Sequence, residues 1–441
     1  MFSQILCILT FLLMAISSHA ALEKFSSAHS VALDGLVKGK IEVEQYELDN
    51  FSTKRNIKNQ LMYSIGQLNG IDGGSPDINK LEIKIEQIEE SENFNTKIVY
   101  YTAKLFVAWP KEQSLKKNLT LFLPKQGNHH FLNNFKEQLG NEKKSANCLG
   151  WGAHDVTTGN FWYYYRPKLE KCPIQFESEE YLNKYIYKLN LNLKYSNQNT
   201  KDKYPEYHKV WEDGVLKVTA IFAKNEKESS VASDAGVQAF NRTIRSIINT
   251  FGHPSQSNLG SDIDLMGYYL GIYHPEIHFI YKLEEGILDI KLFLIGDIKY
   301  TDDIFRQKYN KRTKDSDFVS YSGHSGLGAN IRTLAKMGEF VSDQYQIFLV
   351  NGCDTFAYVD DSLALAHQAV NPMYGPNKFL DIITNAMPSY FHMNHRSNMA
   401  IITGLVNQTE SYAEILGNFD INQRAVVTGE EDNSWPNEFY K

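Results

Sequence analysis

Between residues 215 and 405, apolar strand-like runs alternate with segments of helical periodicity, and this alternation constrains the possible fold more than any other feature of the chain. Apolar strands separated by helices form a parallel or mostly parallel sheet that is covered on both faces. We therefore expect an α/β domain over residues 211–441 with such a sheet and with helices on both of its faces. The predicted strands are Val215–Ala223, Ile287–Ile295, Asp317–Ser322, Tyr345–Val350 and Ala400–Val406.

Three helices are predicted between or beside these strands. The clearest begins at Ser233 and Asp234, which are good N-cap residues, and stops at Gly252, a typical helix terminator. Its apolar residues recur every three or four positions. The other two helices are expected at Leu327–Phe340 and Asn377–Ala386.

Residues 21–210 have a different pattern and are expected to form a β-rich α+β accessory domain. Strands are predicted at Leu81–Ile88, Thr96–Trp109 and Asn118–Pro124, and a short helix at His130–Leu139. The aromatic run Phe161–Tyr165 is interpreted as a strand that covers a core, with an exposed binding face as the alternative. Residues 197–205 are polar without periodicity, which is typical of a linker or long loop.

The first twenty residues have the pattern of a signal peptide. The apolar run Ile5–Ile16 is followed by small residues that end at Ala20, and it is too short for a membrane-spanning helix. We therefore expect a secreted or periplasmic protein without a membrane span. The formal net charge of −7 argues against general nucleic-acid binding. Nothing in the sequence indicates an oligomeric state.

The cysteine count points to one unpaired thiol. Of the four cysteines, Cys7 lies in the predicted signal peptide, which leaves Cys148, Cys172 and Cys353. An odd number in an oxidising compartment leaves one cysteine unpaired or paired between chains. Cys148 and Cys172 share one Gly- and aromatic-rich segment, so we predict a local disulfide between them. Cys353 is then the free thiol.

Two predicted strand ends carry reactive side chains. One strand runs into His324 and the next into Cys353. If the helix between them is a right-handed crossover, the two strands are parallel and the two side chains emerge at the same edge of the sheet. The neighbouring glycines, Gly326 and Gly352 among them, allow backbone N–H groups to approach a substrate. An imidazole beside a thiol together with backbone donors is the chemistry of a cysteine hydrolase.

The segment Asp317–His324, followed by a strand that ends in Asn-Gly-Cys353, resembles the caspase-like (clan CD) cysteine peptidases, over about residues 215–405. The resemblance implies that Cys353 is the nucleophile and His324 the general acid and base, and that a peptide or protein is the substrate, with no cofactor. It also implies an oxyanion site near Ser325 or Gly326 and the amide of Cys353. The family usually has glycine directly after the histidine, where this chain has Ser325. The N-terminal region resembles no family.

Two other interpretations remain open. Ser325 lies between a strand and a helix, as the nucleophile of a serine hydrolase would, although the G-x-S-x-G pattern requires glycine where this chain has Leu327. Alternatively, the caspase-like domain is an inactive scaffold, and the protein acts through interactions of its aromatic-rich N-terminal domain.

The remaining polar candidates give weaker signals. Asp354, Asp360 and Asp361 follow the cysteine and are candidates for lining a pocket that accepts a basic side chain, although a solvated acidic turn explains the last two as well. The spacing of His392 and His395 is compatible with a metal, but no third ligand is evident, and the pair at positions 129–130 is weaker still. No metal site is predicted.

Overall fold

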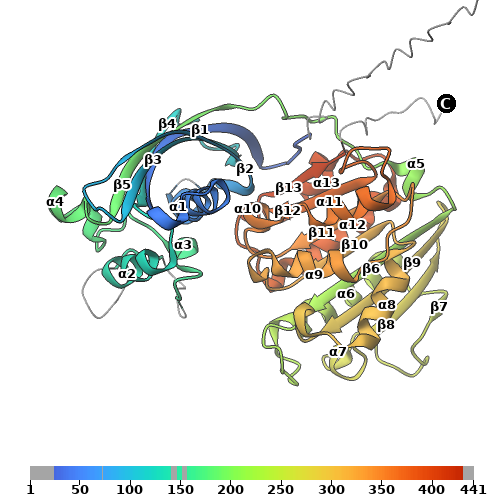
Figure 1. Cartoon of the computed structure of the whole chain (residues 1–441). Coiled ribbons are helices and arrows are strands. Elements are labelled where there is room, and N and C mark those ends of the chain that lie inside the picture. The colour runs from blue at the N-terminus through green and yellow to red at the C-terminus, as the bar shows by residue number, and fades with distance from the viewer. Residues whose placement is uncertain (1–23, 72, 141–146, 151–155, 431–441) are drawn as a thin grey trace, which may run out of the picture.

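The computed structural model describes residues 24–71, 73–140, 147–150 and 156–430 (Figure 1). The predicted signal peptide, with Cys7, lies outside these residues. The described chain contains two sheets, one antiparallel and one mixed, with helices packed against both. No helix in the described ranges is long and apolar enough to cross a membrane.

The N-terminal part is a five-stranded antiparallel sheet that curves around helix α1 (Figure 1). Its strand order is β2-β3-β1-β5-β4. The strands are β1 (Ser30–Glu44), β2 (Ser75–Glu90), β3 (Thr96–Pro110), β4 (Asn118–Pro124) and β5 (Ile186–Tyr195), and the helices are α1 (Asn50–Ile71), α2 (His129–Leu139), α3 (Phe161–Tyr164) and α4 (Glu179–Leu182). The three predicted strands and the short helix in this part are confirmed, whereas α1 was not predicted.

The aromatic run at 161–165 forms a helical turn, so the strand prediction for it was wrong. One turn brings Phe161 and Tyr165 to the same side of the chain, and both rings meet Tyr63 of α1 edge-on, at 5.9 and 5.4 Å between centroids. A strand would also have placed these two residues on one face. Whether residues 161–165 form a helical turn or a strand thus depends on their packing against α1, which lies about a hundred residues earlier in the chain.

The C-terminal sheet has eight strands in the order β13-β12-β11-β10-β6-β9-β8-β7, and it is mixed. Its centre is parallel, from β12 to β9, and antiparallel strands flank the centre on both sides. The parallel strands are β6 (Val215–Ala223), β9 (Ile287–Ile295), β10 (Phe318–Ser322), β11 (Gln346–Asn351) and β12 (Leu380–Asn385); the flanking strands are β7 (Gln256–Ser257), β8 (Glu276–Lys282) and β13 (Ala425–Gly429).

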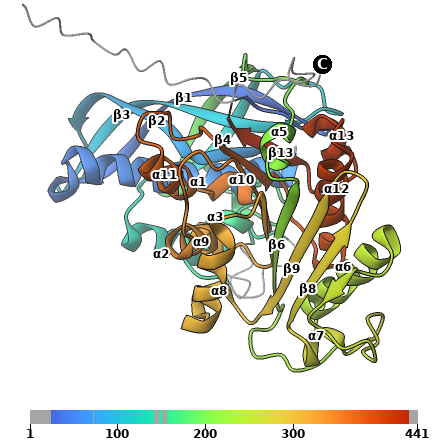
Figure 2. The same ribbon diagram turned by 90° about the vertical axis from the view of Figure 1, so that its right-hand side faces the viewer.

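Helices cover both faces of this sheet (Figure 2). Along β11, Ile347 and Leu349 belong to the core on one face, and Phe348 and Val350 to the core on the other. The first face is covered by α6 (Ala235–Phe251), α12 (Asn394–Asn407) and α13 (Tyr412–Gly417), and the second by α8 (Asp303–Thr313), α9 (Ala329–Met337) and α11 (Ser362–Val370). Short helices occur at α5 (Tyr207–Val210), α7 (Leu270–Tyr273) and α10 (Thr355–Tyr358).

Two predictions of secondary structure in this part were wrong. Residues 380–385 of the predicted helix Asn377–Ala386 form strand β12, and the predicted strand Ala400–Val406 lies inside helix α12. Both segments are buried on nearly all sides, β12 between two neighbouring strands and α12 between the sheet, α6 and α13. An element that is buried on all sides, like these two, shows no regular alternation of apolar and polar residues that separates helix from strand. By contrast, α6 is capped as predicted, since the Asp234 carboxylate accepts hydrogen bonds from Gly236 N and Val237 N.

Taken in chain order, the five parallel strands are arranged 2-1-3-4-5, a common doubly wound order. After β6 the chain enters α6 on one face of the sheet, and after β10 it enters α9 on the other. The helices that follow the neighbouring strands β6 and β10 therefore lie on opposite faces of the sheet. In sheets of this kind, ligands bind at such a switch point, beyond the carboxyl ends of the strands.

Candidate active site

His324 and Cys353 occupy matching positions beyond two adjacent parallel strands. Ser322 at the end of β10 is paired with Asn351 at the end of β11, and His324 and Cys353 each follow two residues later. The amide of Gly323 donates to the Asn351 carbonyl at 3.2 Å, which continues the pairing toward the two side chains. His324 and Cys353 line the same cavity, whose volume is about 230 Å³. The predicted parallel pairing of these strands is thus confirmed.

The His324 ring is exposed and has a defined orientation. Its Nε2 lies 3.1 Å from the carbonyl oxygen of Asn225, in the loop after β6, and its ring meets Phe391 edge-on at 5.2 Å between centroids. Because a carbonyl only accepts, this hydrogen bond requires the proton on Nε2. In the neutral imidazole, Nδ1 then carries the free lone pair and is the atom that can accept a proton.

The Cys353 thiol is partly buried and is neutral at physiological pH. Burial, with a smaller contribution from the neighbouring Asp354 carboxylate, raises its pKa to about 11. Its S–H is directed to the Ser389 carbonyl at 3.4 Å. In this arrangement the sulfur is held as a thiol, so nucleophilic attack requires a base that removes its proton.

A buried network of uncharged amides and hydroxyls supports the strand ends beneath Cys353. The Asn351 side-chain oxygen accepts hydrogen bonds from Asn385 Nδ2 at 2.9 Å, from Ser389 Oγ at 2.7 Å and from Gln423 Nε2 at 3.0 Å. Asn351 in turn donates to Asn394 Oδ1 at 3.2 Å. Of these residues, sequence reasoning noted only Asn351, within Asn-Gly-Cys. The others come from segments that have no local pattern linking them to the cysteine.

Asp354 lies beneath the site and does not line the cavity. It is fully buried and adopts a left-handed backbone with a φ of 50°. Asn69 Nδ2 donates to one carboxylate oxygen at 2.6 Å, and the Tyr163 hydroxyl donates to the other at 2.6 Å. Burial raises the pKa of Asp354 to about 6, while these two donors and the nearby Arg166 act to lower it. All three groups belong to the N-terminal part. Asp354, which directly follows Cys353 in the chain, is therefore held by residues of the part that contains the antiparallel sheet.

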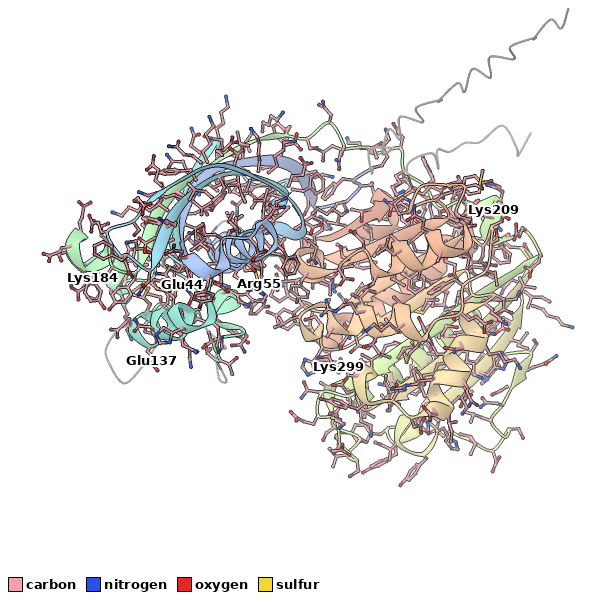
Figure 3. All side chains as sticks on the ribbon, in the orientation of Figure 1. Glu44, Arg55, Glu137, Lys184, Lys209 and Lys299 are labelled. Atoms are coloured by element: carbon pink, nitrogen blue, oxygen red, sulfur yellow. A yellow bond between two sulfur atoms is a disulfide. The ribbon has the colours of Figure 1, made fainter. Side chains whose placement is uncertain are left out.

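The two parts also share a hydrophobic contact at this point. Ala357 and Tyr358 of α10 are buried in the core of the N-terminal part, and the Tyr358 ring lies 6.4 Å from Trp162 of α3. Helix α10 also lies against strand β2 of the N-terminal part, and side chains occupy the space between the two parts (Figure 3). Asn160, Tyr163 and Tyr164 of the N-terminal part consequently line the cavity that contains His324 and Cys353. Sequence analysis did not connect these residues with His324 and Cys353, although Tyr163 and Tyr164 belong to the aromatic run for which it gave a binding face as the alternative.

Asp360 and Asp361 are separated from the two reactive groups. Asp360 forms an ion pair with Arg332 at 3.0 Å, and both aspartates line a different cavity of about 30 Å³. The structure therefore does not place them, or Asp354, against the space beside Cys353.

The turn after β10 supplies Ser325, Gly326 and Leu327 to the cavity. The Tyr358 hydroxyl donates to the Cys353 carbonyl, so Ser325 Oγ, 2.7 Å from the Tyr358 oxygen, donates its own proton to Tyr358. Leu327 has a φ of 52° and is 39% exposed. A left-handed conformation costs a residue with a branched side chain about 1–2 kcal/mol. Gly352 directly follows β11, and its amide donates to Val350 O at 3.1 Å. The Gly352 N–H is therefore already hydrogen-bonded to the end of the strand.

The histidine pairs considered as metal ligands do not assemble a site. His392 stacks against Tyr390 at 5.8 Å between ring centroids, and His129 contacts the Asn133 amide. Within the described ranges, no three His, Cys, Asp or Glu side chains are grouped so that they can hold a metal ion.

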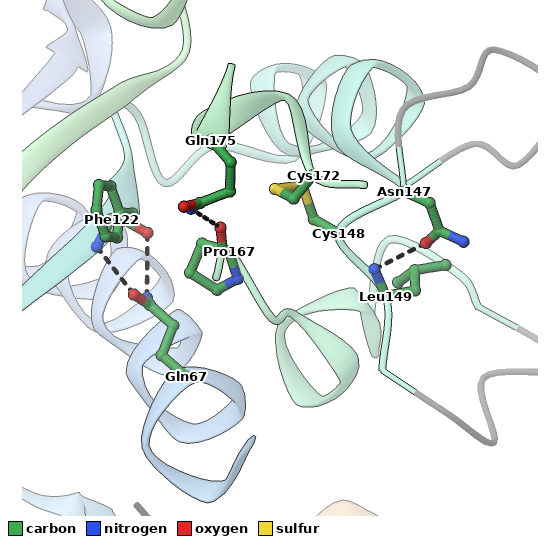
Figure 4. The surroundings of a disulfide bond; sticks show 8 residues. All are labelled: Gln67, Phe122, Asn147, Cys148, Leu149, Pro167, Cys172 and Gln175. Atoms are coloured by element: carbon green, nitrogen blue, oxygen red, sulfur yellow. Dashed lines mark hydrogen bonds between the residues drawn. A yellow bond between two sulfur atoms is a disulfide. The ribbon is translucent and has the colours of Figure 1, made fainter. Parts of the chain in front are cut away.

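The predicted disulfide between Cys148 and Cys172 is present, and Cys353 is free, as predicted (Figure 4). The bridge is buried and joins segments that pack beside α2 and α3. Side-chain hydrogen bonds hold its surroundings, including Gln175 Nε2 to Pro167 O at 2.6 Å.

No family model matches the chain, and no curated protein matches it.

Proposed function

We propose that this chain is an exported cysteine hydrolase of the caspase-like type, which cleaves peptide bonds with Cys353 as nucleophile and His324 as general acid and base. One observation carries the proposal: the two side chains follow paired residues on adjacent parallel strands and line one cavity. That cavity lies beside the switch point of the sheet, because His324 contacts the loop after β6. The disulfide is consistent with export.

The proposed reaction begins with the neutral thiol. Substrate binding displaces the S–H from the Ser389 carbonyl, and His324 Nδ1 takes the proton as the sulfur attacks the peptide carbonyl carbon. Backbone N–H groups of the turn at Ser325 and Gly326 stabilise the oxyanion. The imidazolium then protonates the leaving amine as the C–N bond breaks, and water hydrolyses the thioester with His324 as the base.

The main competing function is a non-catalytic interaction protein, and the raised pKa of Cys353 favours it. A resting thiol that donates to a carbonyl is what a structural cysteine also does. A serine hydrolase has less support, because Ser325 Oγ is hydrogen-bonded to Tyr358 and, among the described residues, forms no hydrogen bond to a histidine.

The decisive experiment compares the wild-type protein with Cys353→Ala on a mixture of unfolded proteins, with new peptide termini detected by mass spectrometry. We expect Cys353→Ala to lose several orders of magnitude in kcat, because a nucleophile is removed. Its thermal unfolding should change little, because only one weak S–H hydrogen bond is lost. Ser114→Ala, at an exposed serine that does not line the cavity, is the control and should retain activity. Equal cleavage by the wild type and Cys353→Ala would remove the proposal.

A further inference from the structure

We infer that the N-terminal part completes the substrate pocket and that the pocket selects an uncharged aromatic or large aliphatic side chain next to the scissile bond. This inference rests on the proposed function and specifies its substrate class. It begins from the composition of the cavity wall. Among the described residues, the cavity is lined by no Asp, Glu, Lys or Arg, whereas Tyr163, Tyr164, Leu327 and Tyr358 contribute large apolar surfaces.

The size of the cavity matches one side chain. Its volume is about 230 Å³, which is smaller than the several hundred cubic ångströms of a site that encloses a whole small molecule. A charged side chain placed there would lose part of its hydration without gaining a counter-charge from an Asp, Glu, Lys or Arg among the described residues. An aromatic or large aliphatic side chain loses no such hydration and gains contact with the rings.

The aromatic wall is held in place before substrate arrives. The Tyr163 hydroxyl donates to buried Asp354, directly after the proposed nucleophile, and Tyr164 packs edge-on against Tyr163 at 4.9 Å between centroids. Tyr163 and Tyr164 thus have a defined position relative to Cys353, although they belong to the other sheet's helices. The proposed selectivity therefore requires the N-terminal part.

Leu327 forms the other apolar wall. It keeps a left-handed backbone that Gly, Asn or Asp would adopt more readily, and its side chain lines the cavity with 39% of its surface exposed. Backbone preference does not account for a leucine at this left-handed position. An apolar contact with substrate does.

The first test measures kcat/KM on fluorogenic peptides that differ only in the residue before the scissile bond, namely Phe, Leu, Ala, Arg or Asp. We expect Phe and Leu to exceed Arg and Asp by at least about tenfold. Tyr164→Ala should lower the Phe rate about tenfold while changing the Ala rate by less than about twofold. Tyr46→Ala is the matched control, since Tyr46 is an exposed tyrosine of the same part, at 81%, and does not line the cavity.

A gain-of-function variant makes the test independent of lost stability. Leu327→Asp places a carboxylate in the cavity and suits the left-handed backbone, so it should raise the Arg-to-Phe ratio of kcat/KM at least about tenfold. Leu327→Asn has the same shape without the charge and should leave Arg disfavoured.

A binding measurement separates this inference from the proposed function. Calorimetric titration of Cys353→Ala with acetylated peptide amides that end in Phe or Arg reports the cavity without catalysis. Wild-type preference for Arg or Asp would overturn the inference and leave the hydrolase intact. No cleavage, but Tyr164-dependent binding of the Phe peptide, would overturn the hydrolase and support the cavity's selectivity. Neither cleavage nor binding would overturn both.

Discussion

Replacing Asp354 by Asn should make the stability of this protein less sensitive to pH near neutrality. The carboxyl group is fully buried, and burial raises its pKa from 3.8 to about 6. The folded state therefore binds this proton more tightly than the unfolded state does. The stabilisation from this group is complete below about pH 4 and is lost as the pH rises through about 6. A shift of about two pKa units corresponds to about 3 kcal/mol of unfolding free energy.

Asn keeps the size of the side chain and suits the left-handed backbone at this position, with its φ of 50°. It also turns one accepting oxygen into an NH₂ group that faces either Asn69 or Tyr163, both of which donate. That mismatch costs about 1–3 kcal/mol at every pH. The variant should therefore be less stable than the wild type at about pH 4, and it should gain about 3 kcal/mol relative to the wild type by about pH 7.5.

The assay is urea unfolding of both proteins, followed by tryptophan fluorescence at several values from about pH 4 to about pH 7.5. Asp360→Asn is the matched control, because it removes a partly exposed carboxylate from the same loop, where it pairs with Arg332. A surface pair contributes about 1 kcal/mol or less, so the control difference should stay within that range. A constant difference between wild type and Asp354→Asn would refute the reasoning. An advantage of the wild type that grows with pH would also refute it. That result would mean that Asn69, Tyr163 and Arg166 lower the pKa of Asp354 more than burial raises it.

Two further predictions concern stability. Replacing both Cys148 and Cys172 by Ala removes the disulfide, which closes a loop with a sequence separation of 24. The free energy of unfolding, measured in urea, should fall by about 3 kcal/mol because the unfolded chain is no longer constrained. A loss below about 1 kcal/mol would contradict this expectation. Lys203→Met should lower it by about 3–5 kcal/mol, because Lys203 Nζ pairs with Asp381 Oδ1 at 2.6 Å with both side chains buried. Adding Asp381→Asn to that variant should restore part of the loss in the same assay, and no recovery would show that the buried charge is not the cause.

The polar segment at 197–205 shows which properties a local sequence pattern predicts and which it does not. As predicted for a linker or loop, it contains no helix or extended strand. Its Lys203 is nevertheless buried, at 1% exposure, where its ammonium group pairs with the buried carboxylate of Asp381 on β12. A lysine in a polar stretch predicts a solvated side chain, and only a distant partner reverses that expectation.

The sequence by itself determined the features that depend on neighbours along the chain. The cap of α6 at Asp234, the strands β6, β9, β10 and β11, and the local disulfide follow from periodicity, turn chemistry and short spacing. Adjacency of β10 and β11 also followed, because a single right-handed crossover connects them. These two strands place His324 and Cys353 at one edge of the sheet.

Only the tertiary structure decided the rest of the candidate site. The types of β12 and α12 depended on which elements bury them, since a segment buried on all sides has no amphipathic periodicity that separates helix from strand. The environment of Cys353 depends on Asp354, on the amide network around Asn351 and on the aromatic wall of Tyr163, groups gathered from remote segments of the chain. Burial and long-range contact set the protonation of the thiol and the shape of the cavity, and neither leaves a local pattern in the sequence.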